Sequence, residues 1–181
     1  MVIRGLDEMT TEYLLNREVE HVLAALTGPN RVVCRVALHT GLRIGDVLAL
    51  TPAKIKAHAI IIEQKTGKPR MVGFPADLRR EMRQCAGEYW VFPGRNDPTK
   101  HRTRQAVYQD MKRAAKAFRL PQVVGPHSLR KVYAVNLLQK YGDIQRVQRA
   151  LNHSSPAVTM IYAMADKLLT ESQGKRRARA R

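Results

Sequence analysis

The stretch from Gly125 to Tyr162 constrains the fold more than any other part of the sequence. Apolar residues recur at helical spacing from Ser128 to Tyr141, between Pro126 and Gly142, which suit the start and the end of a helix. The same stretch carries two imidazoles, one guanidinium and one phenol, in the order His127, Arg130, His153 and Tyr162. Cationic and proton-transferring groups gathered in this way favour the handling of a phosphate.

The rest of the chain combines segments of helical spacing with one β-branched run. We expect helices over residues 16–26, 31–41, 43–50, 76–85, 103–118 and 143–151, and a further helix that begins at Ser155. The run Ile60 to Ile62, a turn over residues 65–69 and the apolar pair that follows predict an antiparallel hairpin, with a third strand at residues 54–58. The sequence therefore predicts an α+β protein that is mostly α-helical, with a small antiparallel three-stranded sheet at one edge.

The net charge of the chain indicates which class of partner it binds. The formal net charge is +17 over 181 residues. An excess of this size attracts polyanions and points to nucleic acid before acidic membranes or acidic proteins, although a basic protein without a specific partner is the alternative. No window approaches the roughly 20 apolar residues of a membrane span, and the N-terminus lacks a signal peptide. We therefore expect a soluble, cytoplasmic protein.

The sequence offers no set of metal ligands. Its two cysteines, Cys34 and Cys85, have neither metal-ligand nor Cys-x-x-Cys spacing, and its histidines and acids do not gather at ligand spacing. We expect no metal and no cofactor. Any phosphate chemistry then has to rely on side chains alone.

Several short motifs follow one another in order along the chain. They are Thr40-Gly41-Leu42-Arg43-Ile44-Gly45-Asp46, the turn that begins at Lys65, Pro126-His127-Ser128-Leu129-Arg130, and Leu151-Asn152-His153-Ser154-Ser155, with Tyr162 nine residues after His153. Together they resemble the catalytic domain of the tyrosine recombinases, also called the phage integrase family, and more distantly the type IB topoisomerases. The resemblance covers the chain from about Asn16 to Tyr162 and implies the fold of that family.

The resemblance also implies a catalytic set, which is Arg43, Lys65, His127, Arg130, His153 and Tyr162. In the family the tyrosine attacks a DNA phosphodiester, forms a 3′-phosphotyrosine and releases a 5′-hydroxyl without a metal. The two arginines and the second histidine would bind the phosphate, the first histidine would help accept the phenol proton, and the lysine would protonate the leaving oxygen. Guanidinium suits this task because it is always charged and can bind two oxygens at once. Asp46 is expected to support the site, and Lys68 is the rival candidate for the lysine.

Other cations are expected to contact the DNA backbone, namely Lys68, Arg70, Arg102, Arg104, Lys112, Arg113 and Lys116. For those on or beside the helix at residues 103–118, a solvated helix face is the alternative. The family usually has glycine where this chain has Asn152. Asparagine is the next-best residue for the left-handed position after a helix, so His153 should keep its place.

The organisation of the chain follows from the same resemblance. We expect a leader or linker remnant at residues 1–12, the catalytic domain at residues 13–172 and a basic flexible tail at residues 173–181. Residues before Asn16 are too few for the N-terminal core-binding domain of most relatives, which predicts either an excised catalytic fragment or a short recombinase.

The expected partner is double-stranded DNA, with assembly into a tetramer on DNA and a monomer possible in isolation. The expected function is site-specific DNA recombination. The alternatives are a type IB topoisomerase, a telomere-resolvase-like enzyme, or a catalytically idle DNA-binding module.

Overall fold

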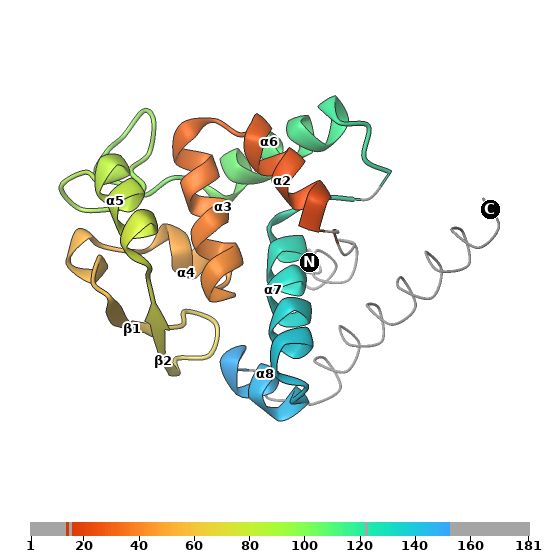
Figure 1. The fold of residues 1–181 in the computed structure, drawn as a ribbon. Helices are drawn as coiled ribbons and strands as arrows, with labels where there is room; N and C mark the ends of the chain where they lie inside the picture. The colour runs from red at the N-terminus through yellow and green to blue at the C-terminus, as the bar shows by residue number, and fades with distance from the viewer. Residues whose placement is uncertain (1–13, 15, 122, 153–181) are drawn as a thin grey trace, which may run out of the picture.

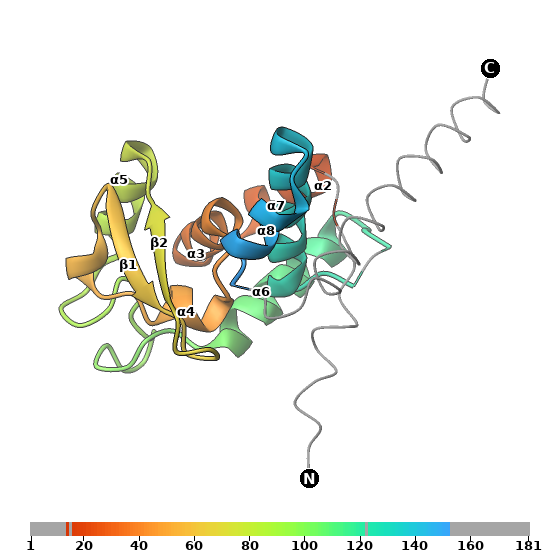
Figure 2. The same ribbon diagram turned by 90° about the horizontal axis from the view of Figure 1, so that it is seen from below.

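The architecture is a set of helices packed around α3, with a two-stranded hairpin on one side (Figures 1 and 2). The computed structural model describes residues 14, 16–121 and 123–152. Its helices and strands are α2 (Asn16–Ala25), α3 (Gly28–Thr40), α4 (Ile44–Leu48), the 3-10 helix η1 (Pro52–Lys54), β1 (His58–Ile62), β2 (Pro69–Gly73), α5 (Ala76–Cys85), α6 (Arg104–Ala117), α7 (Pro126–Tyr141) and α8 (Ile144–Ala150). Among the described residues, no helix is long and apolar enough to cross a membrane. The prediction of a mostly helical α+β protein is confirmed.

Helix α3 is the centre of the packing, since α2, α4, α5, α6 and α7 all contact it. Its buried residues include Val32, Val33, Val36 and Ala37, which recur at the spacing of one helix face. The sequence had predicted that this helix starts at Arg31, but it starts at Gly28. The reason is proline at its first turn, where a preset φ favours the helix and a missing N–H costs nothing.

Side-chain caps fix the starts of two other helices. The hydroxyl of Thr103 accepts a hydrogen bond from the backbone N–H of Ala106, 3.1 Å away, at the start of α6. The carboxylate of Asp143 accepts from the backbone N–H groups of Gln145 and Arg146 at the start of α8. The sequence predicts helices that begin at these two residues, and each cap satisfies backbone donors that a helix start leaves without partners.

The hairpin pairs β1 with β2 in antiparallel register, from His58 opposite Gly73 to Ile62 opposite Pro69. The third strand predicted at residues 54–58 is wrong, because in the described part of the chain the sheet has two strands. Pro52 lacks a backbone donor and starts the short helix η1 instead. The ammonium of Lys54 then donates to the carbonyl of Ile60 at 2.9 Å, where a third strand would offer a backbone N–H.

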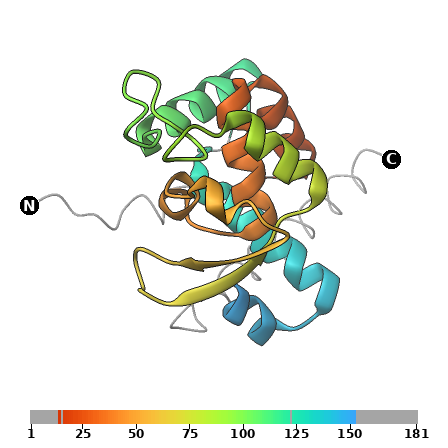
Figure 3. The same cartoon turned by 90° about the vertical axis from the view of Figure 1, so that its left-hand side faces the viewer.

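The hairpin and α8 lie on the same side of the molecule, below the main group of helices in Figure 3. They come from distant parts of the sequence, as the bounds of the elements show. Helix α7 packs against α3 and also against α8, so it joins the main group of helices to α8. The folded chain thus brings the Lys65 turn and the end of α8 to one face.

Gly41 ends α3 in a conformation that few other residues adopt. Its φ is 64°, in the left-handed region, and its N–H donates to the carbonyl of Ala37 at 2.8 Å. A Cβ added there would overlap the ring of Tyr133 on α7. Backbone conformation and close packing therefore both require glycine at this position.

We predict that Gly41→Ala lowers the free energy of unfolding more than Gly142→Ala does. Gly142 ends α7 with a similar φ of 68°, but nothing lies within 4 Å of a Cβ built there. The matched control should lose about 1–2 kcal/mol from the left-handed backbone alone. Gly41→Ala should lose a further ~1–3 kcal/mol from the overlap. Urea denaturation of the three proteins measures both losses, and equal losses would contradict the packing role of Gly41.

Candidate active site

Carbonyl groups at the end of α3 accept hydrogen bonds from two arginine side chains. Arg130 of α7 donates from Nη1 to the carbonyl of Gly41 and from Nη2 to the carbonyl of Leu151, the latter at 2.6 Å. Arg70 of β2 donates to the carbonyls of Thr40 and Gly41. The C-terminus of a helix carries partial negative charge, so it is a favourable place for cations. The position of Arg130, with 3% of the residue exposed, is set by the ends of two helices.

A fully buried carboxylate, that of Glu63, lies next to these arginines. Its Oε2 accepts from Nη1 of Arg43 at 2.7 Å and from the hydroxyl of Thr66 at 3.2 Å. Its Oε1 accepts from Nη1 of Arg70 at 3.4 Å. Glu63 therefore links α4, β2 and the turn between the strands.

Sequence reasoning gave Glu63 no role, although a signal was present. Ala59 and Ile61 point into the core, and Glu63 continues the same alternation by one step. An acid at an inward position is costly unless it has cationic partners. That rule would have pointed to Glu63 as the partner of nearby arginines.

Asp46 of α4 holds the same turn from another direction. Its Oδ1 accepts from the backbone N–H of Gln64 at 2.8 Å, and Oδ2 is buried with no hydrogen-bond donor reaching it from the described residues. Burial raises the pKa of Asp46, and the hydrogen bond from Gln64 and the charges of Arg43 and Arg130 oppose that rise. Asp46 thus lies close to both predicted catalytic arginines and to the residue that precedes Lys65.

Lys65 lies exposed in the turn between β1 and β2. The turn closes with a hydrogen bond from the N–H of Gly67 to the carbonyl of Glu63 at 2.8 Å, and another from the N–H of Glu63 to the carbonyl of Lys68 at 3.1 Å. Gly67 has a φ of 65°, which glycine adopts without strain. The structure therefore places Lys65 in the turn between the two strands, where the sequence predicts a turn.

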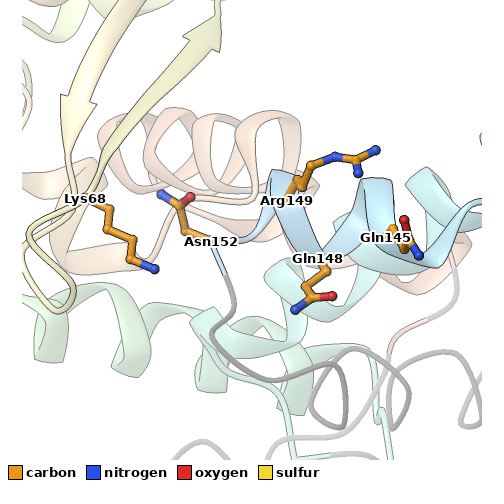
Figure 4. A pocket seen from close by; sticks show the side chains of 5 residues that line it. All are labelled: Lys68, Gln145, Gln148, Arg149 and Asn152. Carbon is orange, nitrogen blue, oxygen red and sulfur yellow. The ribbon is translucent and has the colours of Figure 1, made fainter.

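A cavity of about 380 Å³ separates the hairpin turn from α8 (Figure 4). Lys68 lines it from the hairpin, and Gln148, Arg149 and Asn152 line it from α8 and the residues after that helix. Asn152 has a φ of 49°, which confirms the prediction that asparagine adopts the left-handed position in place of glycine. The cavity therefore reaches Asn152, the last residue that the structure describes.

The remaining predicted site residues fall into two groups. His127 lies partly buried in the first turn of α7, three residues before Arg130. His153 and Tyr162 lie outside the described residues. The structure thus brings Arg43, Arg130, Asp46 and the Lys65 turn together around Glu63 and the end of α3.

The cations expected to contact DNA occupy different environments. Five of them are exposed, namely Lys68, Arg104, Lys112, Arg113 and Lys116. Arg113 also forms an ion pair with Asp110 at 2.7 Å. Arg102 is partly buried. Arg70 does not fit the predicted DNA contact, because it is 8% exposed and its guanidinium bonds to Glu63 and to the end of α3. Its role is internal, since it binds the hairpin to α3.

Comparison with known proteins places this arrangement in a family. The model of the phage integrase family matches residues 12–168. The chain belongs to the phage integrase family. A protein of Bacillus subtilis (strain 168) with the name "Probable integrase/recombinase YoeC" is 31% identical over 182 residues, covering 96% of this chain and 94% of that protein. The chain spans about half the length of most other curated relatives it matches.

Solved structures share the fold. The XerH site-specific recombinase in a post-cleavage complex with a palindromic difH substrate has a TM-score of 0.74 at 22% identity, covering 96% of this chain and 55% of XerH. A lambda integrase tetramer bound to a Holliday junction has a TM-score of 0.67 at 19% identity, covering 83% of this chain and 47% of the integrase chain. At these identities the likeness shows a common fold, which is the fold expected from the motifs.

We predict that the stability difference between the wild type and Asp46→Asn depends on pH. Because its pKa is raised in the folded state, Asp46 contributes stability below its unfolded pKa and loses that contribution as the pH rises through the folded pKa. The asparagine variant does not titrate at this position. As the pH falls from about 7 to about 4, the free energy of unfolding of the wild type should therefore rise relative to that of the variant. Urea denaturation at each pH measures the difference.

Asp110 gives a control of opposite sign. Burial would raise its pKa, but hydrogen bonds from Asn30 and Thr27 outweigh that effect and lower it. The wild type should therefore hold its stability relative to Asp110→Asn down to about pH 4 and lose it only as the pH falls further, through the lowered folded pKa. The same trend for both variants would contradict the assignment for Asp46.

Proposed function

We propose that this chain carries the catalytic domain of a site-specific DNA recombinase that cleaves and rejoins strands through Tyr162. The observation that carries the proposal is the joint position of Arg43, Arg130 and the Lys65 turn in a chain of the phage integrase family. YoeC, XerH and lambda integrase, which resemble this chain, are described as recombinases or integrases. XerH and lambda integrase are bound to DNA in their solved structures.

The two arginines supply the charge that the reaction needs. When the phenol oxygen of Tyr162 attacks the phosphorus, negative charge builds on the non-bridging oxygens of the phosphate. Arg130 is held by carbonyl groups at the ends of α3 and α8, and Arg43 is held by Glu63. Guanidinium groups fixed before the substrate binds need little reorganisation in the transition state.

Proton transfers complete the exchange of bonds. A bond forms between the Tyr162 oxygen and phosphorus, and the bond from phosphorus to the 5′ oxygen breaks. The phenol proton passes to His127, and a proton from Lys65 reaches the leaving 5′-hydroxyl. The covalent phosphotyrosine keeps the energy of the broken link, so attack by a 5′-hydroxyl restores DNA and releases the tyrosine. His153 adds a hydrogen bond to the phosphate.

The proposed partner is double-stranded DNA, on which several copies of the chain assemble. The charge of +17 supports binding to a polyanion. The lambda integrase structure supports a tetramer as the assembly on DNA. The exposed cations of α6, among them Arg104, Lys112 and Lys116, are proposed as contacts with the DNA backbone.

We predict that the wild type forms a covalent adduct with DNA and that Tyr162→Phe does not, because phenylalanine has no hydroxyl to attack phosphorus. The substrate is a pool of nicked duplexes with a randomised central segment, so that cleavage releases a short strand and traps the adduct. Adducts that survive denaturing electrophoresis are counted and their DNA is sequenced. Tyr141→Phe, at an exposed tyrosine of α7, is the matched control and should form adducts as the wild type does. Equal yields from the wild type and Tyr162→Phe would refute the mechanism.

We predict that replacing Lys112 and Lys116 together by alanine weakens DNA binding and reduces its salt dependence. Each lost phosphate contact should lower the slope of log K against log salt by about 0.9, so the pair should lower it by nearly 2. Fluorescence anisotropy across a salt series measures the slope. The control replaces Arg80 and Arg83, two exposed cations of α5 to which no DNA contact is assigned. Equal slopes for the two double variants would contradict a specific role for α6.

A further inference from the structure

We propose that Glu63 is a positioning residue of the strand-cleavage reaction, which holds Arg43 and the Lys65 turn in their relative places. The inference rests on the proposed function and deepens it. It starts from burial, because the side chain of Glu63 is 0% exposed, whereas Lys65 and Thr66 next to it in the turn are exposed. A carboxylate removed from water in this way is stable only where donors surround it.

The donors come from three elements that the site has to bring together. Arg43 precedes α4 as its N-cap residue, Arg70 belongs to β2, and Thr66 follows Lys65 in the turn. A contact that served the hairpin alone would need only Arg70 and Thr66. The shortest of the three bonds, at 2.7 Å, is the one to the predicted catalytic arginine.

The backbone around Lys65 is fixed on both sides by buried acids. The residue before it, Gln64, donates its N–H to Asp46 at 2.8 Å. The residue after it, Thr66, donates its hydroxyl to Glu63 at 3.2 Å. Asp46 belongs to α4, and Arg43 is the residue just before that helix. Both bonds therefore hold the Lys65 turn in a fixed position relative to Arg43. A shift of about 1 Å between catalytic groups can cost a factor of about a hundred in rate.

The charge balance also suits a role in phosphate chemistry. Glu63 carries one negative charge against the two positive charges of Arg43 and Arg70, so the group stays cationic. The bond to Glu63 uses one of the five N–H donors of the Arg43 guanidinium, and 17% of that side chain remains exposed. Glu63 therefore orients the guanidinium without neutralising the cluster.

The test compares Glu63→Gln with the wild type in single-turnover cleavage of a nicked duplex recovered from the adduct pool. Glutamine keeps the shape but loses the charge that holds two guanidiniums, so cleavage should slow by about tenfold or more while the dissociation constant for DNA changes by less than about threefold. Glu81→Gln is the matched control, because Glu81 also pairs with an arginine, Arg35, in a network with Asp77 of α5. It should cleave within about twofold of the wild type.

A double-mutant cycle separates positioning from a general loss of structure. If Glu63 acts through Arg43, Glu63→Gln should cause no further loss of cleavage rate in an Arg43→Ala background. Losses that multiply would show that Glu63 does not act through Arg43 and would overturn the inference. Cleavage by Glu63→Gln at the wild-type rate would overturn it as well.

Two further comparisons keep the test decisive. If thermal unfolding shows that Glu63→Gln is not folded at the assay temperature, Glu63→Asp, which keeps the charge on a shorter side chain, takes its place in the same cycle. Failure of the proposed function looks different, since the wild type itself would then form no adduct. An active wild type with an equally active Glu63→Gln refutes only the role of Glu63.

Discussion

The carbonyl group of Gly41 is the point on which the rest of the site depends. It accepts hydrogen bonds from Arg70 of the hairpin and from Arg130 of α7, two residues separated by 60 positions in the sequence. The left-handed backbone at Gly41 ends α3 and leads directly to Arg43 before α4. One turn thus sets the direction of α4, receives the hairpin and holds a predicted catalytic arginine. The packing of Tyr133 against the same glycine makes the position sensitive to any added atom.

Much of the fold could be predicted from the sequence because its signals are local. Thr103, Asp143 and Gly142 end or begin helices through contacts with their own neighbours, and the structure places them as predicted. The third strand was wrong for a local reason too, since Pro52 starts a short helix and the lysine that follows contacts Ile60 through its side chain. Local rules decide such cases only when the competing turn chemistry is weighed with the strand pattern.

The site was harder to predict where its residues act through distant partners. Family motifs pointed to Arg43, Lys65, His127 and Arg130, but nothing in the motifs distinguishes Arg70, which is buried, from a lysine on the surface such as Lys68. The difference comes from tertiary structure, because the inward face of β2 meets the end of α3 and Glu63 there. Glu63 itself was missed for the same reason, since its three donors belong to separate elements.

The arrangement also offsets the repulsion between neighbouring cations in a site that binds phosphate. Guanidinium and ammonium groups close enough to share one phosphate repel one another before it arrives, and a chain with a charge of +17 adds to that repulsion. Here negative groups face these cations from inside the fold. The buried Glu63 bonds to Arg43 and Arg70, and the carbonyls at the end of α3 bond to Arg70 and Arg130. Because these groups are fixed and largely shielded from water, they hold the cations in place while the exposed turn presents Lys65 to the solvent side. Such an arrangement explains why the acids that matter most for this site are the ones least visible on the surface.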